Sequence, residues 1–196
     1  MAFDQNHFDK VLIEIQRHIE DTETSKLAHW HAADVYGRWH RWFIGLPATI
    51  LATILTWLLS SDFQGLISNT SDSVVLRFLV AQLPVFIAFP VSLLSALGTF
   101  LNYNELAIKH RTAAENLHAL WRNCKNWETD FPDQSMCEKA VQAVQQYRKR
   151  LNEINRDSPQ IPKWAWKSVK KQQIEGSTTY TFENNTEHES NTDSIL

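Results

Sequence analysis

The chain has 196 residues, a net charge of −3 and two cysteines. Two cysteines exclude a disulfide-rich secreted scaffold, and the acid-rich residues 1–26 lack the apolar run of a signal peptide. Charge is unevenly spread: residues 42–108 hold one basic and three acidic side chains, whereas residues 109–175 hold thirteen basic and eight acidic ones. An almost uncharged middle between charged arms predicts a membrane protein with polar segments outside the bilayer.

Residues 1–26 form an N-terminal arm with a helical pattern. Its apolar side chains recur three and four residues apart, which predicts one amphipathic helix. The polar run Asp21–Ser25 favours a short loop before helical sequence resumes at Leu27. The periodic residues are Phe8, Val11, Leu12, Ile15 and Ile19.

The first uncharged segment covers residues 42–60 and reads WFIGLPATILATILTWLLS. At about 1.5 Å per residue it spans roughly 28 Å, which matches the hydrocarbon thickness of a bilayer. Trp42 and Trp57 mark its ends, as residues of an aromatic belt do. The alternative, a buried helix of a soluble core, is weaker because such helices seldom stay apolar on every face.

The second uncharged segment covers residues 78–101 and is interrupted by Pro84, Pro90 and Gly98. Membrane helices tolerate prolines because other backbone conformations leave unsatisfied polar groups in lipid. Each proline weakens its helix locally. Pro47, Pro84 and Pro90 are therefore candidate hinges.

The basic residues around these segments predict the orientation of a transmembrane hairpin. Arg38 and Arg41 precede the first segment, and Lys109 and Arg111 follow the second. The link at residues 61–73 has two acids and no base, and Arg77 is the one dissenting charge. Because cytoplasmic flanks are enriched in Lys and Arg, both termini are expected in the cytoplasm.

Small polar residues form one stripe on each predicted membrane helix. Such stripes occur where helices pack closely, and they also occur along pores or subunit interfaces. Spacing leaves both interpretations open. The first stripe is Thr49, Thr53, Thr56 and Ser60, and the second is Ala88, Ser92, Ser95 and Thr99.

The C-terminal half carries two heptad seams, which are joined by a turn at Phe131–Asp133. They predict an antiparallel helical hairpin, or a bundle shared with the N-terminal arm or with other subunits. We expect a homo-oligomer from them, since one short hairpin buries few apolar side chains. The predicted oligomer seam consists of Leu106, Leu117, Leu120, Trp127, Val144, Tyr147 and Leu151.

The end of the chain is basic and then acidic. Lys163, Lys167, Lys170 and Lys171 alternate with tryptophans, and this segment could lie on anionic lipid, form a solvated helix face or bind nucleic acid. Residues 172–196 are predicted to be an acidic disordered tail.

The residues suggest no catalytic constellation, so we expect neither an enzyme nor a cofactor. Glycines are few, and no phosphate-binding loop is present. The eight histidines lack the spacing of a metal site. His110 and His118, for example, lie about two helical turns apart, and solvated or seam histidines are the better interpretation.

Several features together resemble a known family. They are the runs AHWHAADVYGRWHRWFIGLPATILATI and RLNEINRDSPQIPKWAW, which contain Tyr36 and His40, Gly45 and Pro47, and the Pro159–Pro162 end. This ensemble, over residues 27–171, resembles the SLATT domains. These are bacterial two-transmembrane-helix effectors found beside second-messenger nucleotidyltransferases, nucleotide-sensing domains or reverse transcriptases in conflict and phage-defence loci.

The resemblance implies an all-α protein of the bacterial inner membrane. Its lipid-embedded hairpin would carry a cytoplasmic helical bundle, oligomerise and permeabilise the membrane. The implied partners are a nucleotide second messenger, or a co-encoded nucleotidyltransferase or reverse transcriptase. The alternative is a membrane scaffold or receptor subunit that forms no pore and tethers a partner enzyme.

Overall fold

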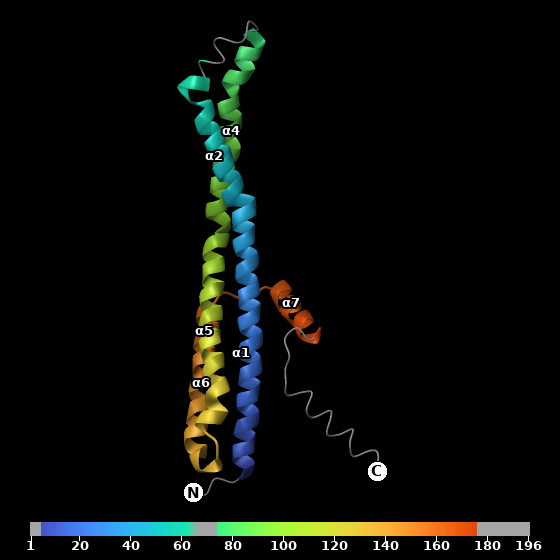
Figure 1. The fold of residues 1–196 in the computed structure, drawn as a ribbon, viewed down its shortest axis with the longest axis vertical. Helices are drawn as coiled ribbons and strands as arrows, with labels where there is room; N and C mark the ends of the chain where they lie inside the picture. The colour runs from blue at the N-terminus through green and yellow to red at the C-terminus, as the bar shows by residue number, and fades with distance from the viewer. Residues whose placement is uncertain (1–4, 64, 66–73, 176–196) are drawn as a thin grey trace, which may run out of the picture. The chain divides into compact units, whose positions relative to one another are not determined.

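A computed structural model describes residues 5–63, 65 and 74–175, and these residues form helices and turns without a strand (Figure 1). The chain divides into two compact units, one formed by Met1–Ala33 with Ile108–Leu196 and the other by Asp34–Ala107. The all-helical fold class is therefore confirmed for the described residues. The elements are α1 (Gln5–Trp39), η1 (His40–Gly45), α2 (Leu46–Leu58), α4 (Val74–Leu101), α5 (Tyr103–Asp130), η2 (Gln134–Met136), α6 (Cys137–Asp157) and α7 (Lys163–Ile174).

The first unit is a bundle in which α1, α5 and α6 share one apolar core (Figure 1). Trp127 of α5 is fully buried at its centre, where the indole Nε1 donates to the Ala140 carbonyl over 3.3 Å. The Phe8 ring of α1 stacks on Trp127 at 5.8 Å. The remaining core residues are Val11, Ile15, Leu117, Leu120, Cys124, Val144 and Ile154.

Helix α1 is continuous through residues 21–25, so the predicted loop there is wrong. Two buried polar side chains in and beside this segment, Thr22 and Lys26, have partners inside the bundle. Buried Thr22 donates its hydroxyl to the His18 carbonyl, and the ammonium of Lys26 lies 3.8 Å from the centre of the Trp121 ring. Because a hydroxyl can bond to its own helix and a cation can rest on an indole face, neither residue ends the helix.

The turn between α5 and α6 lies where the sequence predicts it. Helix α5 ends at Asp130, and the Asp133 carboxylate then accepts the Ser135 backbone N–H over 2.8 Å. This bond makes an Asx-type turn that leads into η2 and α6. The link from α6 to α7 contains Pro159 and Pro162, and α7 begins immediately after Pro162.

Helix α7 belongs to the first unit and packs on α1. Its Ala165 and Val169 side chains are buried, and the Trp164 ring meets His31 edge-on at 5.6 Å. Gln173 donates an amide N–H to the Thr24 hydroxyl over 3.0 Å. Because α7 extends to Ile174, residues 172–174 are helical and the predicted disordered tail began too early. Residues 176–196 lie outside the described part of the chain.

In the second unit, α2 and η1 pack along α4. Pro47 explains the wide π-helical turn before α2, because it has no N–H for the Phe43 carbonyl and its ring would press on that oxygen. Gly98 allows α4 to approach η1 closely, since a Cβ at residue 98 would lie 3.0 Å from the Ile44 methyl group. Asn102, with φ of 45°, is the single residue between α4 and α5.

Candidate functional site

The most distinctive surface of the molecule is the apolar exterior of α2 and α4. The helical stretches Asn6–Leu58 and Val80–Asp130 each contain a window long and apolar enough to cross a membrane. Only 11 % of the first window and none of the second is buried inside the protein. A core helix of a soluble protein has the opposite property, because packing covers its apolar residues. These two helices therefore have an exterior suited to lipid.

Large apolar side chains make up much of this exterior. Phe86 and Phe89 of α4 are 70 % and 71 % exposed, and Phe43 of η1 is 69 % exposed. An exposed apolar surface of this extent marks an interaction with lipid or with another protein. Further exposed members are Trp42, Leu46, Ile50, Ile54, Trp57, Leu59, Val85, Leu93 and Phe100.

The first hydroxyl stripe lies on the outer face of α2. Thr49, Thr53 and Thr56 are exposed, and each hydroxyl donates to the carbonyl four residues earlier at 2.8–2.9 Å. A hydroxyl bonded in this way is satisfied whether it faces lipid, another helix or water. Ser60 follows the end of α2 and is half-buried, so the helical part of the stripe ends at Thr56.

The second stripe is also largely exposed. Ser95 donates to the Val91 carbonyl over 2.9 Å, and Thr99 donates to the Ser95 carbonyl over 3.1 Å. Ser92 is exposed and Ala88 is half-buried. Since the hydroxyl-bearing side chains of α2 and α4 are exposed, they are available to a second copy of the chain or to water.

The candidate hinges lie within or beside these helices. Pro84 and Pro90 both fall inside α4, which is helical from Val74 to Leu101. Each proline removes one N–H donor from the backbone ladder, so the helix is locally weaker at both sites. Pro47 lies at the first turn of α2, directly after the widened turn of η1.

An aromatic cluster at the base of the second unit was not predicted from the sequence. The rings of Tyr36 and Tyr103 stack at 5.7 Å, and Trp39 meets them edge-on at 6.0 Å and 5.7 Å. The cluster joins the end of α1 to the start of α5. Tyr and Trp favour membrane interfaces, and the three-residue spacing of Tyr36 and Trp39 was the available signal.

The predicted oligomer seam lies mainly inside a single chain. Its residues on α5 and α6 are buried against Val11 and Ile15 of α1 or packed at the edge of that core. The bundle shared with the N-terminal arm, one of the alternatives from the sequence, is the arrangement observed. The seam side chains are Leu117, Leu120, Trp127, Val144, Tyr147 and Leu151, whereas half-buried Leu106 belongs to the second unit.

Two histidines of the first unit form a buried pair. His29 of α1 and His110 of α5 place their Nδ1 atoms 2.8 Å apart, and their side chains are 2 % and 0 % exposed. The pKa of His29 is lowered to about 4, mainly by burial and to a smaller extent by the neighbouring His110 ring. Burial also lowers the pKa of His110. The pair could not be recognised in the sequence, because 81 residues separate its members.

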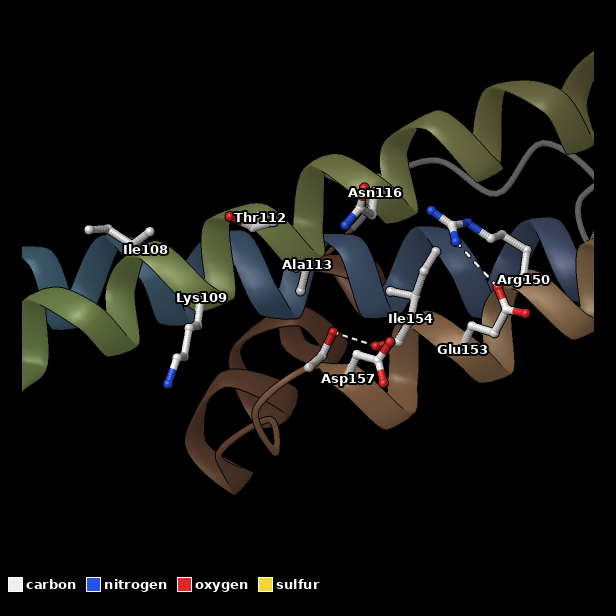
Figure 2. A pocket seen from close by; sticks show the side chains of 10 residues that line it. Ile108, Lys109, Thr112, Ala113, Asn116, Arg150, Glu153, Ile154 and Asp157 are labelled. Atoms are coloured by element: carbon white, nitrogen blue, oxygen red, sulfur yellow. Dashed lines mark hydrogen bonds and ion pairs between the residues drawn. The ribbon is translucent and has the colours of Figure 1, made fainter.

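A hollow of about 260 Å³ with a mixed polar and apolar lining lies between α5 and the end of α6 (Figure 2). Arg150 and Glu153, which line it, form an ion pair at 3.3 Å, and Ile154 and Ala113 also line it. Its other charged groups, Lys109 and Asp157, also have opposite signs. Such a balanced lining does not select an ion of either sign.

The basic face of α7 is a solvated helix face in this structure. Its lysines are exposed, and the opposite apolar side is packed on α1. A helix that lies in a membrane surface needs that apolar side for lipid. The interpretation of α7 as an in-plane membrane helix is therefore not supported.

Within residues 5–63, 65 and 74–175, no three His, Cys, Asp or Glu side chains are grouped in a way that could hold a metal ion. Comparisons with known proteins add no assignment: no family model, curated protein or solved structure matches the chain.

Proposed function

We propose that the protein is a membrane effector that crosses the bacterial inner membrane twice as a helical hairpin and permeabilises it after oligomerising. The observation that carries the proposal is the outward-facing apolar surface of α2 and α4. Both termini would lie in the cytoplasm. No catalytic step is part of this function.

Surface energetics support membrane insertion. Each Å² of apolar surface removed from water contributes about 25 cal/mol, and a fully exposed phenylalanine offers a stabilisation of ~2 kcal/mol on burial. Three phenylalanines of α4, namely Phe86, Phe89 and Phe100, are at least 70 % exposed. A water-soluble monomer with this surface would aggregate, whereas lipid would cover it.

The charge distribution supports the orientation. Four basic residues flank the two apolar segments on the outer side, and residues 61–77 between them contain two acids and one base, Arg77. The positive-inside rule applies to short links of this kind. The first unit, with its charged exterior, would then lie in the cytoplasm.

Permeation is supported by the exposed hydroxyl stripe of Thr49, Thr53 and Thr56. In an assembly of several hairpins, this stripe would line a water-filled path while its apolar neighbours face lipid. The resemblance to SLATT effectors points the same way. It also suggests a nucleotide second messenger, or a co-encoded nucleotidyltransferase or reverse transcriptase, as the activating partner.

The second candidate function is a scaffold or receptor subunit that tethers a partner enzyme at the bilayer. It is favoured by the burial of the heptad seams within one chain, since these seams are then not available for self-assembly. Under this function the hairpin is an anchor and conducts nothing.

Ion flux through liposomes separates the two functions. The wild-type protein is compared with the triple variant Thr49→Val, Thr53→Val, Thr56→Val, which keeps the side-chain shape and removes the hydroxyls. The matched control is Ser95→Ala with Thr99→Val on α4. A pore lined by the α2 stripe predicts flux from wild type and control, with a large loss in the triple variant.

Equal flux from all three proteins would mean that another face lines the pore. Absence of flux from wild type, with the co-encoded partner system supplied, would contradict permeation and favour the scaffold. Insertion of the protein is checked separately by resistance to carbonate extraction.

A further inference from the structure

Two buried imidazoles connect α1 and α5, the helices that run from the first unit into the second. Around His29 and His110 these helices carry small side chains that are also buried, so the helices can approach closely and exclude water. The Nδ1 atoms lie 2.8 Å apart, which is a hydrogen-bond distance. The small neighbours are Ala28, Ala32, Ala33, Ala113 and Ala114.

This hydrogen bond requires a defined protonation state. A neutral imidazole has one N–H donor and one lone-pair acceptor, so one Nδ1 must carry the proton and the other must accept it. A proton added to either ring places a charge in a region without water. A second added proton would direct one N–H at another, which abolishes the bond.

The turns of α1 and α5 beside the two histidines carry cationic side chains. On α1, the Lys26 ammonium rests on Trp121, and on α5 the Arg111 guanidinium lies 5.9 Å from the centre of the Trp30 ring. Lys109, next to His110 in the chain, adds a third cation. Helix α7 contributes the exposed cations Lys163 and Lys167.

The acids on the adjacent part of α6 already have basic partners. Glu153 pairs with Arg150 at 3.3 Å, and Asp157 pairs with Arg156 at 3.1 Å. Both carboxylates line the hollow of Figure 2, together with Lys109. A proton on the histidine pair is therefore opposed by burial, and a proton on His29 is opposed also by the neighbouring His110 ring. This agrees with the lowered pKa values of both rings.

We propose that His29 and His110 form a proton-sensitive clasp, which holds α1 to α5 at neutral pH and releases them on acidification. The direction of this pH dependence follows from the pKa of His29, which is about 4 in the folded protein and 6.5 for a solvated imidazole. The clasp is fully closed above pH 6.5 and is lost as the pH falls toward 4. Because α1 continues to Trp39 and α5 begins at Tyr103, release acts on both helices that enter the second unit. The clasp goes beyond the proposed function and does not depend on permeation.

Hydrogen exchange of the full-length protein in detergent micelles tests the clasp. Amide protection of residues 26–33 and 107–114 is measured from pH 7.5 to pH 4.5 and corrected for intrinsic exchange rates. For the wild type we expect protection to fall by roughly one to two orders of magnitude across this range. The pair variant His29→Leu with His110→Leu should lose this pH dependence, whereas the exposed control His118→Gln should retain it.

Unchanged wild-type protection at pH 4.5, or the same loss of protection in the leucine pair, would overturn the proposal. If the leucine pair does not fold, the NMR titration of the wild-type imidazole Cε1–H signals decides. Titration of His29 well below pH 6 supports the clasp, and titration at 6.5 or above contradicts it.

Discussion

The two units of this protein differ in whether their large apolar side chains are buried or exposed. In the bundle, Leu117 and Trp127 are fully buried while the charged residues of the same helices are exposed. In the α2–α4 pair, Phe86 and Trp57 are 70 % and 57 % exposed on helices with almost no charge. The bundle has the pattern of a protein folded in water, and the helix pair has the pattern of a protein surrounded by lipid.

This difference shows that hydrophobicity alone does not decide which residues are buried. Both units are built from long helices with regular apolar spacing. In the bundle, water drives the apolar stripe of each helix against the other two. In the helix pair, large apolar side chains remain exposed, and the helices approach closely at Gly98.

The largest expected effect is on the bundle core. Leu117→Asp places a carboxylate where the side chain is fully buried, and we expect a loss of about 4 kcal/mol or more in unfolding free energy. Thermal unfolding followed by circular dichroism measures it. The matched control is Asn116→Asp, because Asn116 is next to Leu117 in the chain and its side chain is exposed. If Leu117→Asp only dissociated an oligomer and left the helices folded, Leu117 would belong to a subunit contact.

The same change in the second unit should affect insertion and leave folding of the bundle intact. Phe86→Asp introduces a charge near the middle of α4, at an expected cost of about 3 kcal/mol for transfer into lipid. The fraction of protein in the carbonate-resistant membrane pellet should fall, while Phe86→Leu should insert like the wild type. An unchanged pellet fraction for Phe86→Asp would contradict the lipid assignment of this face.

A smaller effect is expected where α4 approaches η1. Gly98→Val would push side-chain atoms against Ile44, whose methyl lies 3.0 Å from the position of an added Cβ, at a cost of ~1–3 kcal/mol. Thermal unfolding in detergent should show this loss and its partial rescue by Ile44→Ala. Gly37→Ala is the control with the opposite sign, since an added Cβ there meets open space and alanine stabilises a helix by about 1 kcal/mol.

The smallest effect is expected at the bundle surface. Arg148 of α6 forms an ion pair with Glu14 of α1, and the two side chains are partly exposed. Exposed pairs of this kind contribute between about 0 and 1 kcal/mol, so Arg148→Gln should leave the thermal midpoint nearly unchanged. A large loss of stability would mean that the pair organises the bundle.

Periodicity and charge were sufficient to predict the helices, the turn after α5 and the positions of the two apolar segments. They were insufficient where the fold depends on contacts between distant residues. The polar run at residues 21–25 looked like a loop, yet Thr22 within it and Lys26 beside it have partners inside the bundle. The contact between His29 and His110 could not be predicted for the same reason, since only the packing of α1 on α5 brings the two residues together.

The seam on α5 and α6 illustrates the remaining ambiguity. Heptad spacing specifies a helix with one apolar stripe, and it does not specify which helix covers that stripe. In this structure Val11 and Ile15 of α1 cover it. The number of subunits therefore cannot be inferred from the seam. In the proposed function, the exposed faces of α2 and α4 are the surfaces left for self-assembly.

Membrane topology in living bacteria tests the central claim most directly. Reporter fusions are placed after residues 20, 67 and 190, and each is scored with a phosphatase active only in the periplasm and with a fluorescent protein active only in the cytoplasm. The hairpin predicts a periplasmic signal at residue 67 alone, with cytoplasmic signals at residues 20 and 190. Cytoplasmic signals at all three positions would contradict a membrane-crossing hairpin, and a periplasmic signal at either terminal position would contradict its orientation.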